Sequence, residues 1–474
     1  MDQLEPPLVV PDLSFKVADP SDEGYTRSLS RRQMQMLAMG GAIGVGLFLG
    51  AGGRLHSSGP ALMLAYAAAG IIAFLLMRAL GELVMYRPTS GSFVSYAREF
   101  FGPRTAYVSG WMYMLNWGMT GIAELSAVAV YVAYWWPALP HWVAALVALA
   151  IVASINLVSV RVFGEFEFWA SVLKVTALCV FLAVGLGLVL TGTHLGKDRA
   201  GPAQLFDHGG FIPQGVWPVV LVLNGVIFAY SAIEIIGIAA GESDDPQRVI
   251  PRAIKAIVLR ISIFYVGSVL LLAMLLPYTA FSSTESPFVT VFARLGVPGI
   301  GGVMNFVVLT AAMSSCNSGL YSIGRIMRTL AMEGDAPSFA ARMSKQNVPY
   351  GGILMTAAFY LLGVLLNFAF PGQAFEIALN MASVGILWTW GTIFACQLRF
   401  RAAAKRGEVP EPTFRMPGSP YTSWIGLIFL ALVFVLIGFD HPVGTWTVAL
   451  TPVVGVLLWV GWLVARRRSA SLGG

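Results

Sequence analysis

Charged residues are scarce in this chain: Asp, Glu, Lys and Arg make up 11% of its 474 residues. Soluble globular proteins carry about 25%, so this composition excludes a water-soluble fold. Hydrophobic residues reach 57%, and the mean hydropathy is +0.73. A chain of this composition belongs in a lipid bilayer.

Cysteine is also rare. The three residues, Cys179, Cys316 and Cys396, fall in three different hydrophobic segments and do not make a disulfide framework. The histidines are isolated and lack the spacing of a metal site. We therefore expect no metal and no cofactor.

Motifs of nucleotide-driven transport and of catalysis are absent from the sequence. It contains neither the Gly-x-x-x-x-Gly-Lys-Ser/Thr phosphate loop nor the Gly-x-Ser-x-Gly turn of serine hydrolases. No polar segment is long enough to form an ATPase domain. These absences argue against an enzyme and favour an ion gradient as the energy source.

Hydrophobic windows of transmembrane length recur along the whole chain. A helix of about 17 to 25 apolar residues crosses the hydrocarbon core, and the pattern predicts an all-α membrane protein with twelve such helices. The expected spans are 33–53, 61–83, 106–134, 142–160, 168–190, 216–240, 256–276, 300–324, 351–370, 376–396, 422–438 and 444–465.

Basic residues predict the orientation. Lys and Arg stay on the cytoplasmic side of a membrane, and nearly all of them fall in segments that are cytoplasmic if the N-terminus is inside. The exceptions are Arg54, Lys197, Arg199 and Arg294, together with Lys174 inside an expected span. We expect a protein of the inner (plasma) membrane with both termini cytoplasmic, and we attribute its net charge of +6 to topology rather than to nucleic-acid binding.

Glycine is unusually dense in the first span. Each glycine in a helix costs roughly 1 kcal/mol relative to alanine, so the run favours a broken helix whose free backbone groups bind a polar ligand. Close helix packing is the alternative explanation. The glycines are Gly40, Gly41, Gly44, Gly46 and Gly50.

A second break is expected in the sixth span, where Glu234 follows Phe228 to Ile233 in an apolar stretch. Breaks five helices apart predict two inverted five-helix repeats with the ligand between them. The expected units are an N-terminal tail 1–32, the first repeat 33–190, an external loop 191–215, the second repeat 216–396, a cytoplasmic loop 397–421, two further helices 422–465 and a C-terminal tail 466–474.

Three motifs resemble those of the amino acid transporter family within the amino acid/polyamine/organocation superfamily. They are residues 41–48 (GAIGVGLF), 91–97 (GSFVSYA) and 237–242 (GIAAGE). Residues 23–25, 110–113, 116–117 and 119–122 are most similar to the members of this family that carry L-asparagine in bacteria. The similarity covers nearly the whole chain.

The resemblance implies a LeuT-like fold that binds an amino acid between discontinuous helices one and six. Helix N-termini favour anions, so we expect backbone N–H groups to hold the substrate carboxylate and carbonyls to hold its ammonium. Val45 stands where relatives carry Thr or Ser, and Ala232 stands where many carry Gly. The expected binding residues of the two breaks are Ala42, Ile43, Gly44, Val45, Gly46, Phe228, Ala229, Tyr230, Ser231 and Glu234.

Membrane-buried charges are candidates for ion coupling. Lys174 falls about two turns into the expected fifth helix, with Glu234 or Glu242 as its acidic partner or as the proton carrier. By resemblance, a lysine here replaces the ion of sodium-coupled relatives and favours protons. A static ion pair, or snorkelling to the interface, is the alternative.

Further polar groups fall inside the third and eighth spans. Glu124 and Thr120 share a helix face on which they could reach the substrate side chain, and Asn317 and Ser318 are candidates for the inner pathway. Hydrogen bonding between helices is the alternative for all four. Trp117, like Tyr230, is a candidate gate or simply a packed aromatic residue.

We therefore expect a proton-coupled permease that imports L-asparagine or a similar neutral polar amino acid by alternating access. Amino acid exchange, and transport of GABA, aromatic or basic amino acids, stay open. A transporter-like sensor is less expected, because the N-terminal tail is only about thirty residues long. A channel fits broken helices less well than a carrier does. The oligomeric state is not predicted.

Overall fold

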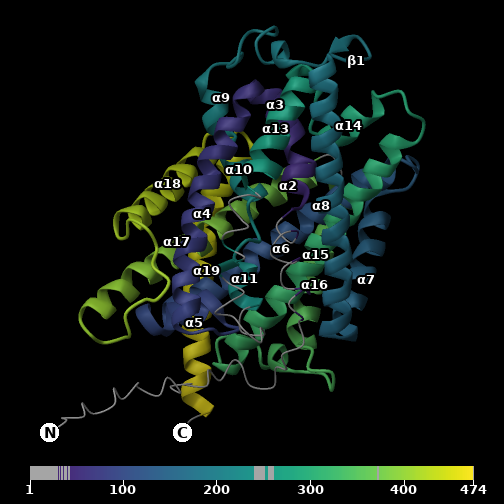
Figure 1. Cartoon of the computed structure of the whole chain (residues 1–474). Helices are drawn as coiled ribbons and strands as arrows, with labels where there is room; N and C mark the ends of the chain where they lie inside the picture. Colours follow the sequence, from purple (N-terminus) through teal and green to yellow (C-terminus); the bar gives the residue numbers. More distant parts are fainter. Residues whose placement is uncertain are drawn as a thin grey trace, which may run out of the picture.

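The computed structural model describes residues 30, 32–33, 36, 40, 43–239, 251–252, 254, 261–370 and 373–472. Nearly all of the ordered elements in this part of the chain are helices (Figure 1). The strands there are β1 (His194–Leu195) and β2 (Asp198–Arg199), which pair antiparallel in the expected external loop. The chain thus has an all-α architecture with one small ribbon.

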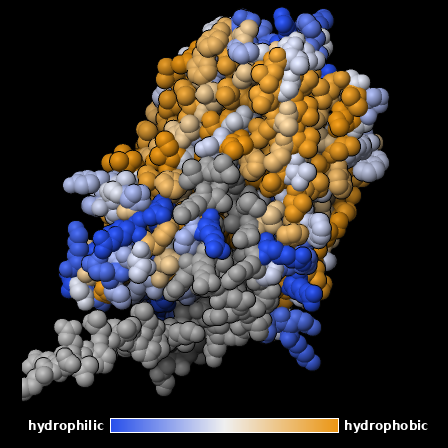
Figure 2. Space-filling model, in the orientation of Figure 1, coloured by the Kyte–Doolittle hydropathy of each residue, from blue (hydrophilic) through white to orange (hydrophobic). Residues whose placement is uncertain are grey.

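Seven helical stretches of the described residues are long and apolar enough to cross a membrane. They are Gly50–Tyr86, which joins α3 (Gly50–Ser58), η2 (Gly59–Ala61) and α4 (Leu62–Tyr86), then α7 (His141–Val158), α8 (Val160–Thr191), α15 (Ile300–Met332), α16 (Tyr350–Ala369), α17 (Ala374–Lys405) and Val443–Arg467 of α19 (Val443–Leu472). Figure 2 shows a broad hydrophobic surface with hydrophilic residues gathered toward its two ends. Both observations are those of a multi-pass membrane protein.

The other helices are shorter, more polar or connect the long ones. They are α2 (Val45–Phe48), α5 (Ser92–Phe101), α6 (Pro103–Ala133), η3 (Pro202–Leu205), α9 (Val216–Leu221), α10 (Leu223–Ala229), α11 (Ile235–Ala239), the π-helix η5 (Ile261–Gly267), α13 (Ser268–Leu275), η6 (Tyr278–Ala280), α14 (Pro287–Ala293), η7 (Ser338–Ala341) and α18 (Tyr421–Ile437). In Figure 1, α5 and the end of α19 lie at one end of the molecule, and α9 and β1 lie at the other.

Both expected breaks are present in the described residues. Gly44 has an extended backbone (φ −126°, ψ −160°) directly before α2. In the sixth span, α10 ends at Ala229 and α11 begins at Ile235, and between them Ala232 has a left-handed φ of 74°. Local backbone preference thus predicted where these two helices stop.

The expected spans 142–160 and 168–190 leave residues 161–167 as a loop. This prediction is wrong, because these residues are helical. Ser159 separates α7 from α8, and its side chain accepts a hydrogen bond from the Val162 N–H at 3.2 Å. This N-cap starts α8 well before the expected residue 168. Lys174 consequently lies near the middle of its helix, not two turns from the end. Similarly, α17 continues beyond the expected residue 396 to Lys405.

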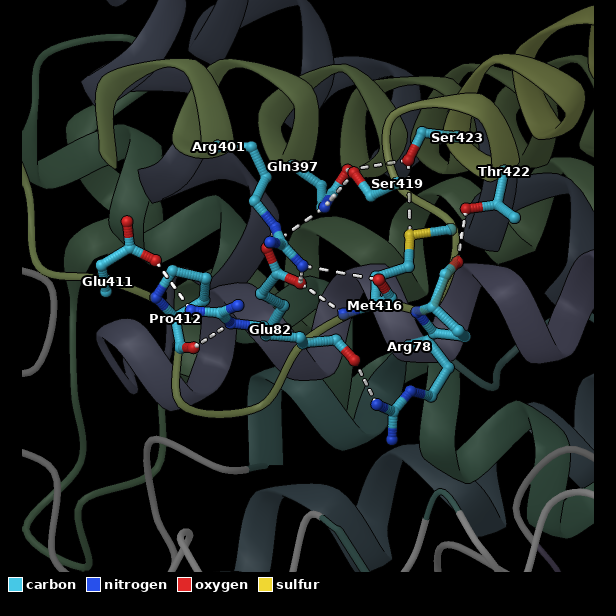
Figure 3. A network of polar contacts seen from close by, with 12 residues as sticks. Arg78, Glu82, Gln397, Arg401, Glu411, Pro412, Met416, Ser419, Thr422 and Ser423 are labelled. Carbon is cyan, nitrogen blue, oxygen red and sulfur yellow. Dashed lines mark hydrogen bonds and ion pairs between the residues drawn. The ribbon is translucent and has the colours of Figure 1, made fainter. Parts of the chain in front are cut away.

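A polar network ties the segment between α17 and α18 to α4 (Figure 3). The buried Glu82 carboxylate accepts hydrogen bonds from Arg401 at 2.5 and 2.9 Å, from the Met416 N–H at 2.6 Å and from Gln397 at 3.1 Å. Arg78 donates to the Arg415 carbonyl. These bonds satisfy the buried Glu82 carboxylate. They therefore hold the segment between α17 and α18 against α4.

Candidate functional site

The two interruptions lie against each other in the protein interior. A Cβ placed on Gly46 would lie 2.5 Å from the Cα of Ala229. Contacts between backbones at this distance require glycine, since backbone atoms cannot move aside as a flexible side chain can. The expected residues Ile43 and Phe228 are buried beside them, whereas Ala42 lies outside the described residues.

Tyr66 of α4 connects the two breaks and was missed by the sequence analysis. Its carbonyl accepts the hydroxyl of Tyr230 at 2.8 Å, and its own hydroxyl donates to the Gly46 carbonyl at 3.4 Å. The Tyr230 ring stacks on Tyr265, with centroids 4.6 Å apart. Tyr230 is therefore held by packing as well as by a hydrogen bond. No sequence motif marked Tyr66, because it lies in an ordinary apolar helix.

The Glu124 carboxylate lies at the start of α2. Its Oε1 accepts a hydrogen bond from the Val45 N–H at 3.4 Å, and it would lie 2.7 Å from a Cβ placed on Gly44. The expectation that this N–H is free for substrate does not hold in this structure. Thr120 is directed elsewhere and donates to Asn116 at 3.3 Å. A carboxylate here is stabilised by the helix N-terminus.

Glu234, in the turn between α10 and α11, is fully buried. Neither of its carboxylate oxygens has a hydrogen-bond partner among the described residues. The indole N–H groups of Trp117 and Trp390 are directed at it, but neither reaches hydrogen-bond geometry, and the nearby Tyr113 hydroxyl is equally unsatisfied. Buried polar groups are normally paired, so this cluster has unused capacity for a proton, water or a polar ligand.

The carboxylate next to Lys174 is that of Glu167, which was not among the expected partners Glu234 and Glu242. Lys174 Nζ lies 3.9 Å from Glu167 Oε1 and donates to the Gly40 carbonyl at 2.8 Å and to Ser314 Oγ at 3.0 Å. Ser314 in turn donates to Glu167 at 2.6 Å. Glu242 lies outside the described residues.

Glu167 was missed because the expected helix began one residue after it. On α8 it stands seven residues before Lys174 and therefore on the same face. With the helix start placed correctly, this seven-residue spacing would have indicated that Glu167 and Lys174 are neighbours. Lys174, Glu167 and Ser314 thus connect α8 and α15 to the Gly40 carbonyl, just before the first break.

Asn317 serves as a connection between helices. Its side-chain oxygen accepts from Asn156 of α7 at 2.7 Å, and its amide donates to Glu167 at 3.5 Å. These bonds favour the alternative of interhelical hydrogen bonding. Ser318 is buried, and its hydroxyl has no partner within the described ranges.

A cavity of about 630 Å³ opens at the end of the molecule that carries α3 and α9. Arg54 lines it, donates to the Gly50 carbonyl at 2.6 Å and lies across Gly225, where a Cβ would be 1.7 Å from its Nε. The carboxylates of Glu376 and Asp440 line the same cavity. The cavity therefore presents both signs of charge, which suits a zwitterion.

Comparison with known proteins identifies the family. The profile described as "Amino acid permease" matches residues 33–471. The chain is 52% identical to an L-asparagine permease of Escherichia coli K12 over 453 residues, which is 95% of this chain and 91% of the relative. It is 54% identical to an L-asparagine permease of Streptomyces coelicolor over 459 residues, covering 96% and 94%. It is also 53% identical to L-asparagine permease 2 of Mycobacterium tuberculosis over 466 residues, covering 98% and 95%. With a family match over almost the entire chain, this protein belongs to the amino acid permeases.

Proposed function

We propose that this permease imports L-asparagine, or a similar neutral polar amino acid, together with protons across the inner membrane. The meeting of two broken helices beside the unpaired Glu234 carboxylate carries this proposal. Free backbone at the breaks recognises the α-amino and α-carboxylate groups common to amino acids. The names of the relatives favour asparagine as the substrate.

The proposed architecture is a LeuT-like pair of inverted repeats, 33–190 and 216–396, followed by helices 422–465, with twelve spans in all and both termini cytoplasmic. The order of elements supports it. In each half, an interrupted helix is followed by a second helix, a short helix (α5 or α14), and then three long helices. The three are α6, α7 and α8 in the first half and α15, α16 and α17 in the second.

In the proposed site, the N–H groups of Gly44, Val45 and Gly46 hold the substrate carboxylate. Glu124 already accepts from Val45, so substrate binding there requires Glu124 to turn away. The carbonyls of Ala42, Ile43, Ala229 and Tyr230 receive the ammonium, with Phe228 and Ser231 beside them. Thr120 and Glu124 border the space for the side chain.

Coupling is proposed to run through the buried charges. A lone carboxylate is costly to bury, so Glu234 is suited to exchange a proton during the transport cycle, with Glu242 as a second carrier. Lys174, held by Glu167, anchors the chain before the first break. Trp117 and Tyr230 serve as gates, and Ser318 borders the inner pathway, whereas Asn317 connects the helices.

The test is uptake of labelled L-asparagine into proteoliposomes under a pH gradient, with a sodium gradient and no gradient as controls. We expect uphill uptake with the pH gradient alone and the strongest competition from unlabelled asparagine. Uptake driven only by sodium would overturn proton coupling. Exchange with a preloaded lumen, without uphill uptake, would make the protein an antiporter. Stronger competition from another amino acid would replace asparagine as the substrate.

A further inference from the structure

An apolar groove lies between α6, α17, α18 and α19, remote from the interrupted helices. Its volume is about 510 Å³. Its outer wall, α19, lies at the periphery of the molecule, where only 6% of its most apolar stretch is buried. The apolar lining includes Val108, Met112, Leu387, Leu430, Phe434 and Leu458. Hydrocarbon chains are the natural content of such a groove in a bilayer.

Arginines lie at the end of this groove nearest α5. Arg104, the second residue of α6, is exposed and lines the groove, with its guanidinium carbon 3.8 Å from the ring centroid of Trp459. Arg466 lies 4.5 Å from the ring centroid of Trp462. Arg104 makes no ion pair with any residue that the structure describes. The groove therefore combines an apolar lining with the positive charge of Arg104 at one end.

We propose that this groove binds one anionic phospholipid, with an acyl chain between α6 and α19 and the phosphate on Arg104. A guanidinium matches the geometry of a phosphate, and Trp459 and Trp462 are of the type that marks the membrane interface. The uncapped start of α6 adds free N–H groups beside Arg104. Basic pockets between transmembrane helices bind anionic headgroups in this way.

A second apolar crevice provides the contrast. It is lined by residues of α7, α8 and α15 and also contains an arginine, Arg161. The Glu165 carboxylate lines that crevice too and forms an ion pair with Arg32 at 2.5 Å. The start of α8 beside Arg161 is also capped by Ser159, whereas the start of α6 beside Arg104 is uncapped and no carboxylate of the described residues lines its groove. Arg161→Gln is therefore a matched control for Arg104→Gln.

The experiment is native mass spectrometry of the full-length protein titrated with phosphatidylglycerol or phosphatidylcholine of identical acyl chains. We expect one phosphatidylglycerol to bind more tightly than phosphatidylcholine. Loss of one arginine contact near the membrane surface should weaken binding about fivefold in Arg104→Gln. Arg161→Gln should bind like the unmodified protein.

Two further variants fill the groove without a clash. A Cβ on Gly455 would meet nothing within 4 Å, and one on Gly391 would meet only Leu427 at 4.0 Å. Gly391→Leu and Gly455→Leu should therefore fold but lose the bound lipid. Gly187→Leu, at an equally open position on α8, should retain it.

Equal binding of the two lipids, or unchanged binding in both Arg104→Gln and Gly455→Leu, would overturn the proposal. If the protein instead bound no lipid and formed a concentration-dependent dimer that Gly455→Leu abolishes, the proposal would also be overturned. A second copy of this chain would then be the occupant of the groove. Asparagine uptake takes no part in these measurements, so failure of the transport proposal would leave this one standing.

Discussion

Individual buried charges in this permease are held in different ways. Lys174 has a complete set of partners in Glu167, Ser314 and the Gly40 carbonyl. Glu234 has no hydrogen-bond partner among the described residues, although two indole N–H groups face it. A satisfied charge is suited to hold structure, and an unsatisfied one is suited to change its protonation or bind a ligand. The two residues should therefore respond differently to substitution.

Glu234→Gln should abolish uphill uptake while leaving exchange of labelled for unlabelled amino acid intact, because an amide keeps the shape of the side chain but cannot carry a proton. Uptake and counterflow in proteoliposomes check this. Glu408→Gln, which changes an exposed carboxylate paired with Arg406, is the control and should accumulate normally. Normal accumulation by Glu234→Gln would remove its proposed coupling role.

Glu167→Gln should destabilise the protein, because it removes the carboxylate that lies 3.9 Å from the buried Lys174 ammonium. Removal of one partner from a buried pair costs about 3–5 kcal/mol. Thermal unfolding in detergent measures the effect. The double variant with Lys174→Met should recover part of the loss, since neither buried charge of the pair is then present. Additive losses in the double variant would mean that the two residues do not interact.

At the scale of elements, the breaks in the first and sixth spans differ in their local chemistry. Gly44 has the extended conformation without a side chain to place, and Gly46 admits the backbone of α10. Ala232 instead carries a Cβ at φ 74°. A left-handed conformation costs a non-glycine residue roughly 1–2 kcal/mol. The turn after α10 therefore contains local strain that a glycine at this position would avoid.

Ala232→Gly should raise the thermal unfolding temperature, since it removes a strain of about 1 kcal/mol. Ala150→Gly, in the middle of α7, is the matched control and should lower it, because glycine destabilises a helix interior by roughly 0.5–1 kcal/mol. Differential scanning fluorimetry of the purified variants distinguishes the two. A lower unfolding temperature for Ala232→Gly would contradict the proposed strain.

At the scale of the whole molecule, the structure has two polar ends separated by a hydrophobic surface (Figure 2). The α5 end carries the Glu82–Arg401 network and Arg406, whereas the opposite end carries the β-ribbon and the cavity lined by Arg54. Basic residues favour the cytoplasmic side. We therefore propose that the α5 end faces the cytoplasm.

Single cysteines test this orientation in intact cells. A membrane-impermeant maleimide should label Asp207→Cys, beyond the β-ribbon, and should not label Arg406→Cys, after α17. Both positions are exposed in the structure. The parent chain, with Cys179, Cys316 and Cys396 replaced by serine, is the blank. Labelling of position 406 and not of 207 would reverse the topology.

Composition and local backbone rules by themselves determined the membrane class, the positions of both breaks and the polar residues inside the spans, because these properties depend on neighbours along the chain. Tertiary structure decided which polar groups meet. Glu167 beside Lys174, Glu124 on the Val45 N–H and Tyr66 between the two breaks were not foreseen. Glu167 was not predicted because the expected helix began after it. The contacts of Glu124 and Tyr66 join residues far apart in the sequence. Such pairs are fixed by how helices pack, and packing is a property of the folded chain as a whole.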